Sequence, residues 1–356
     1  MDVVLVEPDY YTRFPPLGLL KISTYHKRRG DRVKLVRVRA DGLWKPAKRP
    51  GRVYVTSLFT WSWRPVWKAV RFYKKQFPKT KVWLGGLYAS LMPKHAARSG
   101  ADVIHDGVLK EAENLPPDYT LVPEWDGSLI FSSRGCDNSC AFCAVPKLEG
   151  KLNSAKRSIK RLVHPRHTRI ILLDNNFLQS PYWKNICNEL EELDKYVDFN
   201  QGLDARLIND EVAKRLSNIK LQSGSSIKIR LAYDRRGAGS AVEKAIGRLE
   251  HCGIRRRDVM VYVLYNYKND PGDFFQNVRD VLDWGAVAYP MRYEPLDALK
   301  KNRYVDQRWT SEELEMVQDA RRVLGFGGAL PPYSALVEKF DDAHDFEEAF
   351  SLDAVS

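Results

Sequence analysis

The sequence predicts an α/β protein: an N-terminal doubly wound parallel sheet, a second set of parallel strands, and a helical C-terminal extension. Short β-branched runs alternate with amphipathic stretches along most of the chain, which is typical of parallel strands crossed by helices. A proline-rich segment separates the runs into a set of five and a set of six. Residues 301–356 carry helical patterns and no strand-like run.

The first set predicts a five-stranded doubly wound domain over residues 1–112. Between its third and fourth runs, apolar residues recur at helical spacing from Pro65 to Phe77, and proline suits a first helical turn. The five predicted strands are Val3–Val6, Val33–Val36, Val53–Leu58, Val82–Leu84 and Asp102–Ile104.

Residues 113–125 are predicted to form a linker, since they contain Pro116, Pro117 and Pro123. The second set of strands follows at Leu129–Phe131, Ile170–Leu173, Val197–Phe199, Ile227–Ala232, Met260–Leu264 and Val287–Tyr289. Helical stretches separate them at Trp183–Leu193, Asp210–Leu216, Val242–Cys252 and Asp273–Leu282. Six βα units are fewer than the eight that close a full barrel, so residues 126–300 are expected to form a partial (βα)6 barrel.

The C-terminal extension, residues 301–356, begins with a helix signal. Thr310 and Glu313 have the spacing of a capping box, and the helix is expected to end at Gly325. The acidic segment Asp341–Glu348 is expected to be a surface helix or a tail.

Composition narrows the class of protein. The chain has 356 residues, 44% hydrophobic and 29% charged, an ordinary balance for a globular protein with a core. No apolar stretch is long enough for a membrane span, and no secretory signal precedes the first strand. The expected location is therefore cytoplasmic. The net charge of +12 favours a polyanionic partner, nucleic acid first, the alternative being a soluble protein that is simply basic.

Cysteine usage indicates a metal site in a reducing compartment, because three of the five cysteines fall within eight residues. Cys136, Cys140 and Cys143 follow the first strand of the second set, at the edge where α/β proteins bind ligands. Three thiolates at this spacing can converge on one cubane and leave its fourth iron open. The alternatives are a zinc site completed by His164 or His167, and a redox disulfide.

The CxxxCxxC spacing, with Phe142 before the last cysteine, resembles the signature of the radical S-adenosylmethionine superfamily. The resemblance implies that Cys136, Cys140 and Cys143 ligate a 4Fe–4S cluster whose open iron chelates S-adenosylmethionine. An electron from a flavodoxin- or ferredoxin-type donor would then cleave that molecule to methionine and a 5′-deoxyadenosyl radical. Phe142 would lie near the adenine. Cys187 and Cys252 fall on apolar helix faces and are expected to pack in the core.

Polar residues just beyond the other strands are expected to face the same site. The superfamily often binds the methionine amino group there with a Gly-Gly-Glu motif, which this sequence lacks, so Asp174 and Asn175 are the proposed substitutes. The alternative for every such residue is a salt bridge or a helix cap, and Asp204 and Arg206 could equally satisfy one another. The further candidates are Gln201, Asp204, Arg206, Arg230 and Asp234, with Asn266 and Arg292 on later strands.

Two branches of the superfamily are resembled. The segment from Arg134 to Pro146 looks like the methylthiotransferases, although residues 1–135 lack the three further cysteines of that family. Residues 1–112 resemble the cobalamin-binding-type domain, through Pro15-Pro16-Leu17-Gly18-Leu19-Leu20, Gly30-Asp31-Arg32-Val33 and Leu84-Gly85-Gly86. Without an Asp-x-His-x-x-Gly motif no histidine is placed to ligate cobalt. Gly85-Gly86 either admits a cofactor's phosphate tail or makes a tight turn.

Two basic segments favour an anionic or nucleic-acid substrate. Residues 151–169 contain seven lysines and arginines and no acid, and Arg255, Arg256 and Arg257 form a second group. The sequence thus predicts a radical enzyme that abstracts hydrogen or supports methyl transfer. The alternatives are a cobalamin-dependent methyltransferase and a non-enzymatic, zinc-stabilised nucleic-acid-binding protein.

Overall fold

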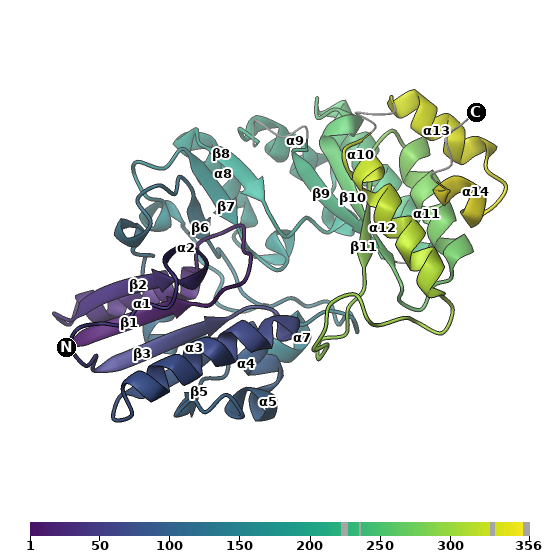
Figure 1. Cartoon of the computed structure of the whole chain (residues 1–356). Helices are drawn as coiled ribbons and strands as arrows, with labels where there is room; N and C mark the ends of the chain where they lie inside the picture. Colours follow the sequence, from purple (N-terminus) through teal and green to yellow (C-terminus); the bar gives the residue numbers. More distant parts are fainter. Residues whose placement is uncertain (222–226, 235, 328–331, 352–356) are drawn as a thin grey trace. The chain divides into compact units, whose positions relative to one another are not determined.

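The computed structural model describes residues 1–221, 227–234, 236–327 and 332–351 (Figure 1). The chain forms two compact units. The first contains Met1–Leu129, Asn138–Gly150 and Glu294–Arg303, and the second contains Ile130–Asp137, Lys151–Tyr293 and Tyr304–Ser356.

The first unit is built on the predicted five-stranded sheet, which is parallel and has the order β2-β1-β3-β4-β5. Between β1 and β3 the chain changes from building one side of the sheet to building the other. Ligands of doubly wound sheets bind at such a switch point, outside the carboxyl ends of the strands. The strands are β1 (Asp2–Glu7), β2 (Arg32–Arg37), β3 (Arg52–Ser57), β4 (Lys81–Gly86) and β5 (Val103–Ile104).

Helices cover both faces of this sheet, because side chains alternate along each strand. Val3 and Leu5 of β1 pack with Leu19 and Leu20 of α1, whereas Val4 and its alternate neighbours pack with the apolar stripe of α3. The predicted helix at 65–77 is α3. The helices are α1 (Leu17–Lys27), α2 (Val38–Asp41), α3 (Trp63–Gln76), α4 (Leu87–Leu91), α5 (Pro93–Ala97) and α6 (Lys110–Glu113).

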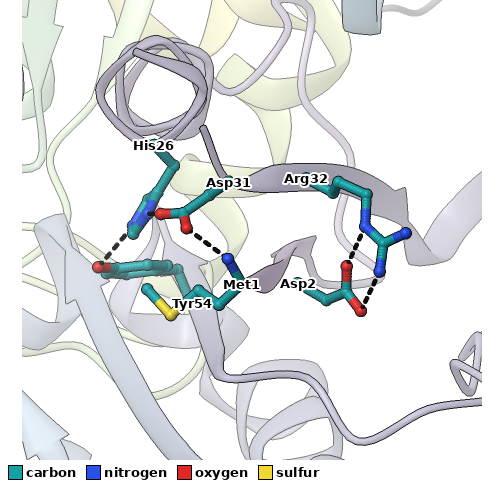
Figure 2. A network of polar contacts seen from close by, with 6 residues as sticks. All are labelled: Met1, Asp2, His26, Asp31, Arg32 and Tyr54. Atoms are coloured by element: carbon teal, nitrogen blue, oxygen red, sulfur yellow. Dashed lines mark hydrogen bonds and ion pairs between the residues drawn. The ribbon is translucent and has the colours of Figure 1, made fainter. Parts of the chain in front are cut away.

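A polar network joins α1 to the start of the sheet (Figure 2). His26 is 1% exposed; its Nδ1 lies 2.7 Å from Asp31 Oδ2 and its Nε2 lies 3.1 Å from the Tyr54 hydroxyl. The N-terminal ammonium donates to Asp31 Oδ1 at 2.6 Å. Burial lowers the pKa of His26, and the contact with Asp31 opposes this effect.

Residues 113–125, predicted as a linker, belong to the first unit. Asp118 accepts from the Ser23 hydroxyl at 2.6 Å and pairs with Lys27 at 2.7 Å. The buried Tyr119 accepts from the backbone N–H of Leu129 through its hydroxyl.

The six predicted strands of the second set form two three-stranded sheets with the orders β6-β7-β8 and β11-β10-β9. Five of these strands lie wholly in the second unit, whereas Ser128 and Leu129 of β6 belong to the first. The ladder stops after β8, where the chain turns at Gly202 (φ +85°). Beyond this turn the N–H of Leu203 donates to the Arg230 carbonyl of β9 at 2.8 Å, so β8 and β9 remain neighbours. The strands are β6 (Ser128–Ile130), β7 (Arg169–Leu172), β8 (Tyr196–Phe199), β9 (Ile229–Tyr233), β10 (Val259–Tyr265) and β11 (Val287–Arg292).

One hydrophobic core runs through this unit. The capping box of Thr310 and Glu313 is present and begins the first helix of the C-terminal extension. The acidic C-terminal segment is more than a surface element, because Phe346 and Phe350 of α14 are buried and Phe350 packs on Phe274. The longer helices are α8 (Trp183–Leu193), α9 (Asp210–Asn218), α10 (Gly239–His251), α11 (Pro271–Asp283), α12 (Ser311–Gly325) and α13 (Tyr333–Asp342), and the short helix α14 is Phe346–Phe350. Among the described residues, no helix has the length and apolar character needed to cross a membrane.

Candidate functional site

The segment that leads into the cysteine motif is held by one buried carboxylate. Asp174, directly beyond β7 and 2% exposed, accepts four hydrogen bonds from the two serines that follow β6. Its Oδ1 accepts from the Ser132 hydroxyl at 2.6 Å and from the N–H and hydroxyl of Ser133 at 2.6 and 2.8 Å. Its Oδ2 accepts from the N–H of Ser132 at 3.0 Å. Burial raises the pKa of Asp174, and these hydrogen bonds oppose the rise.

A glycine directs the chain from these serines to the first cysteine. Gly135 has φ +75°, and a Cβ atom built on it would overlap the carbonyl oxygen of Lys151. Arg134 and Asn153 form an antiparallel bridge beside it, with N···O distances of 3.0 and 2.7 Å. Only glycine combines this backbone conformation with such a close approach.

Cys136 is half-buried, and its sulfur has an amide neighbour. The Nδ2 of Asn176 lies 3.8 Å from Cys136 Sγ and 3.3 Å from Asp204 Oδ2. Asn176 is 5% exposed, and its Oδ1 is buried without a hydrogen-bond partner. The sequence pattern predicted its neighbours Asp174 and Asn175 as site residues but not Asn176, although all three follow β7.

The loop passes from the second unit to the first after Asp137, so its two parts belong to different units. In the first unit, Cys140 and Cys143 are joined by a turn in which the Cys143 N–H donates to the Cys140 carbonyl at 3.0 Å. The Sγ of Cys143 accepts from the N–H of Val145 at 3.4 Å. Phe142, between them, is half-buried.

All five cysteines are free thiols. Within the described ranges of the chain, no group of three or more His, Cys, Asp or Glu side chains lies close enough together to hold a metal ion. Convergence of the three thiolates on one cluster therefore remains a prediction.

The remaining predicted residues are mostly engaged with protein groups. Arg206 forms a bidentate ion pair with Asp204, whose Oδ1 also accepts from the Arg206 N–H. Arg230 is buried in an ion pair with Asp198 of β8. Gln201 is exposed and its side chain contacts Asn200 at 3.5 Å, while Asn175 and Asp234 are half-buried beyond β7 and β9. Asp204, Arg206 and Arg230 are thus in ion pairs, as the salt-bridge alternative expects.

Asn266 and Arg292, the two candidates on later strands, hydrogen-bond to residues that follow β11. The buried Asn266 donates to the Tyr304 carbonyl at 3.0 Å and accepts from the N–H of Asp306 at 2.8 Å. Arg292 donates to the same Tyr304 carbonyl at 3.1 Å.

The cysteines outside the motif pack in the core. Cys187 is 3% exposed, and burial raises the pKa of its thiol to about 12. Cys252 is half-buried against the same core cluster.

The carboxyl edge of the first unit's sheet carries exposed apolar side chains. Tyr11 follows β1, Phe59 follows β3, Leu87 follows β4 and Val108 follows β5, with exposures of 71%, 36%, 44% and 41%. Gly86 in this edge has φ +99°, and a Cβ on it would overlap the Ser57 carbonyl, which favours the tight-turn interpretation of Gly85-Gly86.

No protein-family model matches the chain, and no curated protein matches it. Among solved structures, TsrM from Kitasatospora setae, a radical S-adenosylmethionine methyltransferase with cobalamin and a 4Fe–4S cluster bound, has a TM-score of 0.57. It is 14% identical, and the match covers 83% of this chain and 77% of that one. A second structure of that enzyme, with tryptophan substrate and the analogue aza-SAM, matches with the same TM-score and covers 75% of that chain. This likeness establishes the fold.

Proposed function

We propose that this chain, which has the fold of a radical S-adenosylmethionine enzyme, holds a 4Fe–4S cluster on Cys136, Cys140 and Cys143. The observation that carries the proposal is the construction of the loop. Asp174 and Gly135 fix its beginning at the carboxyl end of β6, so that the motif starts at the edge where an α/β unit binds its ligands.

The donor groups suit an iron–sulfur cluster. The three thiols are half-buried and unbridged, as cluster ligands must be before they load. Two of them already have N–H donors: the Asn176 amide at Cys136 Sγ and the Val145 backbone at Cys143 Sγ. Hydrogen bonds to ligand sulfurs are among the means by which proteins tune such clusters.

When bound, the cluster supplies the electron that splits S-adenosylmethionine into methionine and a 5′-deoxyadenosyl radical. The chain's own residues have positioning roles. Asp174 fixes Ser132 and Ser133, which lead into the motif, and Asn176 places an amide N–H beside the Cys136 sulfur. Phe142, between the last two cysteines, would lie near the adenine.

Metal analysis tests the proposal. After anaerobic reconstitution with iron and sulfide, the full-length protein should hold about four irons per chain. Cys140→Ala should lose most of them, and Cys252→Ala, a matched change outside the motif, should keep them. Stoichiometric zinc without iron, or equal iron in both variants, would overturn the assignment.

A second candidate function, cobalamin-dependent methyl transfer, is favoured by the apolar edge of the first unit. Its exposed apolar side chains follow the carboxyl ends of the strands, the end of the sheet where doubly wound folds take their ligands. A corrinoid has a large, partly apolar face that suits it.

Absorbance titration of the full-length protein with hydroxocobalamin tests this candidate. Leu87→Glu, which places a charge in the apolar edge, should weaken binding about 10-fold. Lys75→Glu, which places a glutamate at an exposed position of α3, should not. Binding unaffected by either change would remove the first unit from the cofactor site.

The substrate and partners belong to the same proposal. The basic segment 151–169 follows the motif and supports an anionic or nucleic-acid substrate, and reduction of the cluster calls for a flavodoxin- or ferredoxin-type donor. A cytoplasmic location fits three unbridged thiols.

A further inference from the structure

We propose that the second unit contains a separate binding pocket for a small molecule bearing a phosphate monoester, built on Arg255, Arg256 and Arg257. These arginines form the turn that leads into β10. They line an open pocket of about 490 Å³ together with Glu250, Gly253, Gly285 and Tyr333. This volume is within the range of small-ligand sites.

The charge of the pocket fits a phosphate dianion. Its lining side chains comprise three positive groups and one negative group, a balance of +2. The balance stays +2 when the neighbouring Lys228 and Asp258 are included, since these two pair with each other at 3.0 Å. A phosphate monoester carries about −1.5 to −2 at pH 7.

The three arginines differ in how their charges are compensated. Arg255 pairs with the buried Asp258 at 2.8 Å, and Arg256 pairs with Glu250 at 2.7 Å. Among the described residues, Arg257 has no carboxylate partner within ion-pair distance. Its charge is therefore the one most available to an external anion.

Arg257 is also held in position before any ligand arrives. Its guanidinium carbon lies 3.6 Å from the centre of the Tyr333 ring, and it donates to the Gly327 carbonyl. The Tyr333 hydroxyl in turn shares its one proton between the carbonyl oxygens of Leu282 and Ala286, at 2.8 and 2.9 Å. A fixed guanidinium loses little conformational entropy when it binds an oxyanion.

Two glycines border the pocket. Gly253 and Gly285 have φ values of +90° and +75°, and a Cβ built on Gly285 would lie 3.1 Å from Cδ of Arg256. Both glycines and the arginine turn precede β10 or β11, whereas the candidate cluster residues follow the carboxyl ends of their strands. The pocket is thus at the other end of the strands and does not depend on the proposed function.

The pocket dimensions and ion pairs favour a compact ligand over a nucleic-acid backbone. A polynucleotide offers one charge per phosphate and needs an extended row of available cations. Here two of the three arginines are already tied to carboxylates, which leaves one localised site.

Isothermal titration of the full-length protein tests the proposal with three probes: inorganic phosphate, adenosine 5′-monophosphate, and a short single-stranded RNA without terminal phosphates. Phosphate and the nucleotide should bind saturably, and Arg257→Gln should weaken both by about 10-fold or more, the effect of losing one charge-assisted hydrogen bond. Arg257 also packs on Tyr333, so its replacement removes a structural contact as well as a charge. Arg256→Gln is therefore the second variant, and it should also weaken binding of phosphate and of the nucleotide.

The matched control is Arg322→Gln, which removes one charge from an exposed position of α12 and should leave binding unchanged. Equal losses in Arg257→Gln and Arg322→Gln, or no saturable binding of phosphate and nucleotide, would overturn the proposal. So would preferential binding of the RNA that is lost in Arg257→Gln, since it would assign the pocket to a phosphodiester.

Discussion

Replacing Asp174 by asparagine should destabilise the second unit and loosen the cysteine loop. The carboxylate accepts from two backbone N–H groups and two hydroxyls, all of them buried. An asparagine can place its carbonyl oxygen where Oδ1 lies and keep the three bonds to that atom, from the Ser132 hydroxyl and from the N–H and hydroxyl of Ser133. Its NH₂ group would then face the N–H of Ser132, donor against donor.

One orphaned buried N–H costs about 1–3 kcal/mol. In a unit of this size, that lowers the midpoint of thermal unfolding by about 2–12 °C. Asp174→Ala leaves all four donors without their acceptor and should cost more. Asp210→Asn is the control, because its side chain is 93% exposed and should change stability by no more than about 0.5 kcal/mol.

Thermal unfolding followed by circular dichroism measures the loss of stability. The iron retained after reconstitution measures the loosening of the cysteine loop. Asp174→Asn should lose iron, since the serines that it anchors lead directly into the motif. An Asp174→Asn midpoint within about 1 °C of the wild type would show that these hydrogen bonds do not hold the loop.

Three further predictions concern His26, Gly135 and Cys187. Burial lowers the pKa of His26, so below about pH 6.5 this histidine binds more protons in the unfolded chain than in the folded one. The free energy of unfolding should therefore fall as the pH drops through that value. This pH dependence should be smaller in His26→Gln and unchanged in His251→Gln, whose side chain is exposed. Gly135→Ala should cost more than about 3 kcal/mol by chemical denaturation and abolish iron loading, whereas Gly237→Ala, at an open position, should do neither. With a pKa of about 12, only ~10⁻⁴ of Cys187 is thiolate at pH 8. After iodoacetamide treatment of the folded apoprotein, mass spectrometry should therefore find Cys187 unmodified and Cys136, Cys140 and Cys143 labelled. Rapid labelling of Cys187 would contradict its burial.

The strands were the most predictable part of the fold, because β-branched runs and period-two burial leave a direct trace in the sequence. All eleven predicted strands are present. The interruption of the strand ladder between β8 and β9 was not predictable, since it depends on how the chain turns at Gly202 and meets Arg230 of β9.

The candidate site was predictable only where spacing along the chain determines it. The cysteine motif is such a case. Asp174 was found by its position beyond a strand, but its role as the anchor of Ser132 and Ser133 depends on contacts 41 and 42 residues apart. Asn176 was missed for the same reason, because nothing local distinguishes it from Asn175.

The central claim is that the three cysteines support reductive cleavage of S-adenosylmethionine. The most direct measurement incubates the reconstituted protein anaerobically with dithionite and S-adenosylmethionine and quantifies 5′-deoxyadenosine in the wild type and in Cys140→Ala. We expect this nucleoside in the wild type and its loss in the variant. S-adenosylmethionine left intact by an iron-loaded wild type, or equal product from both proteins, would contradict it.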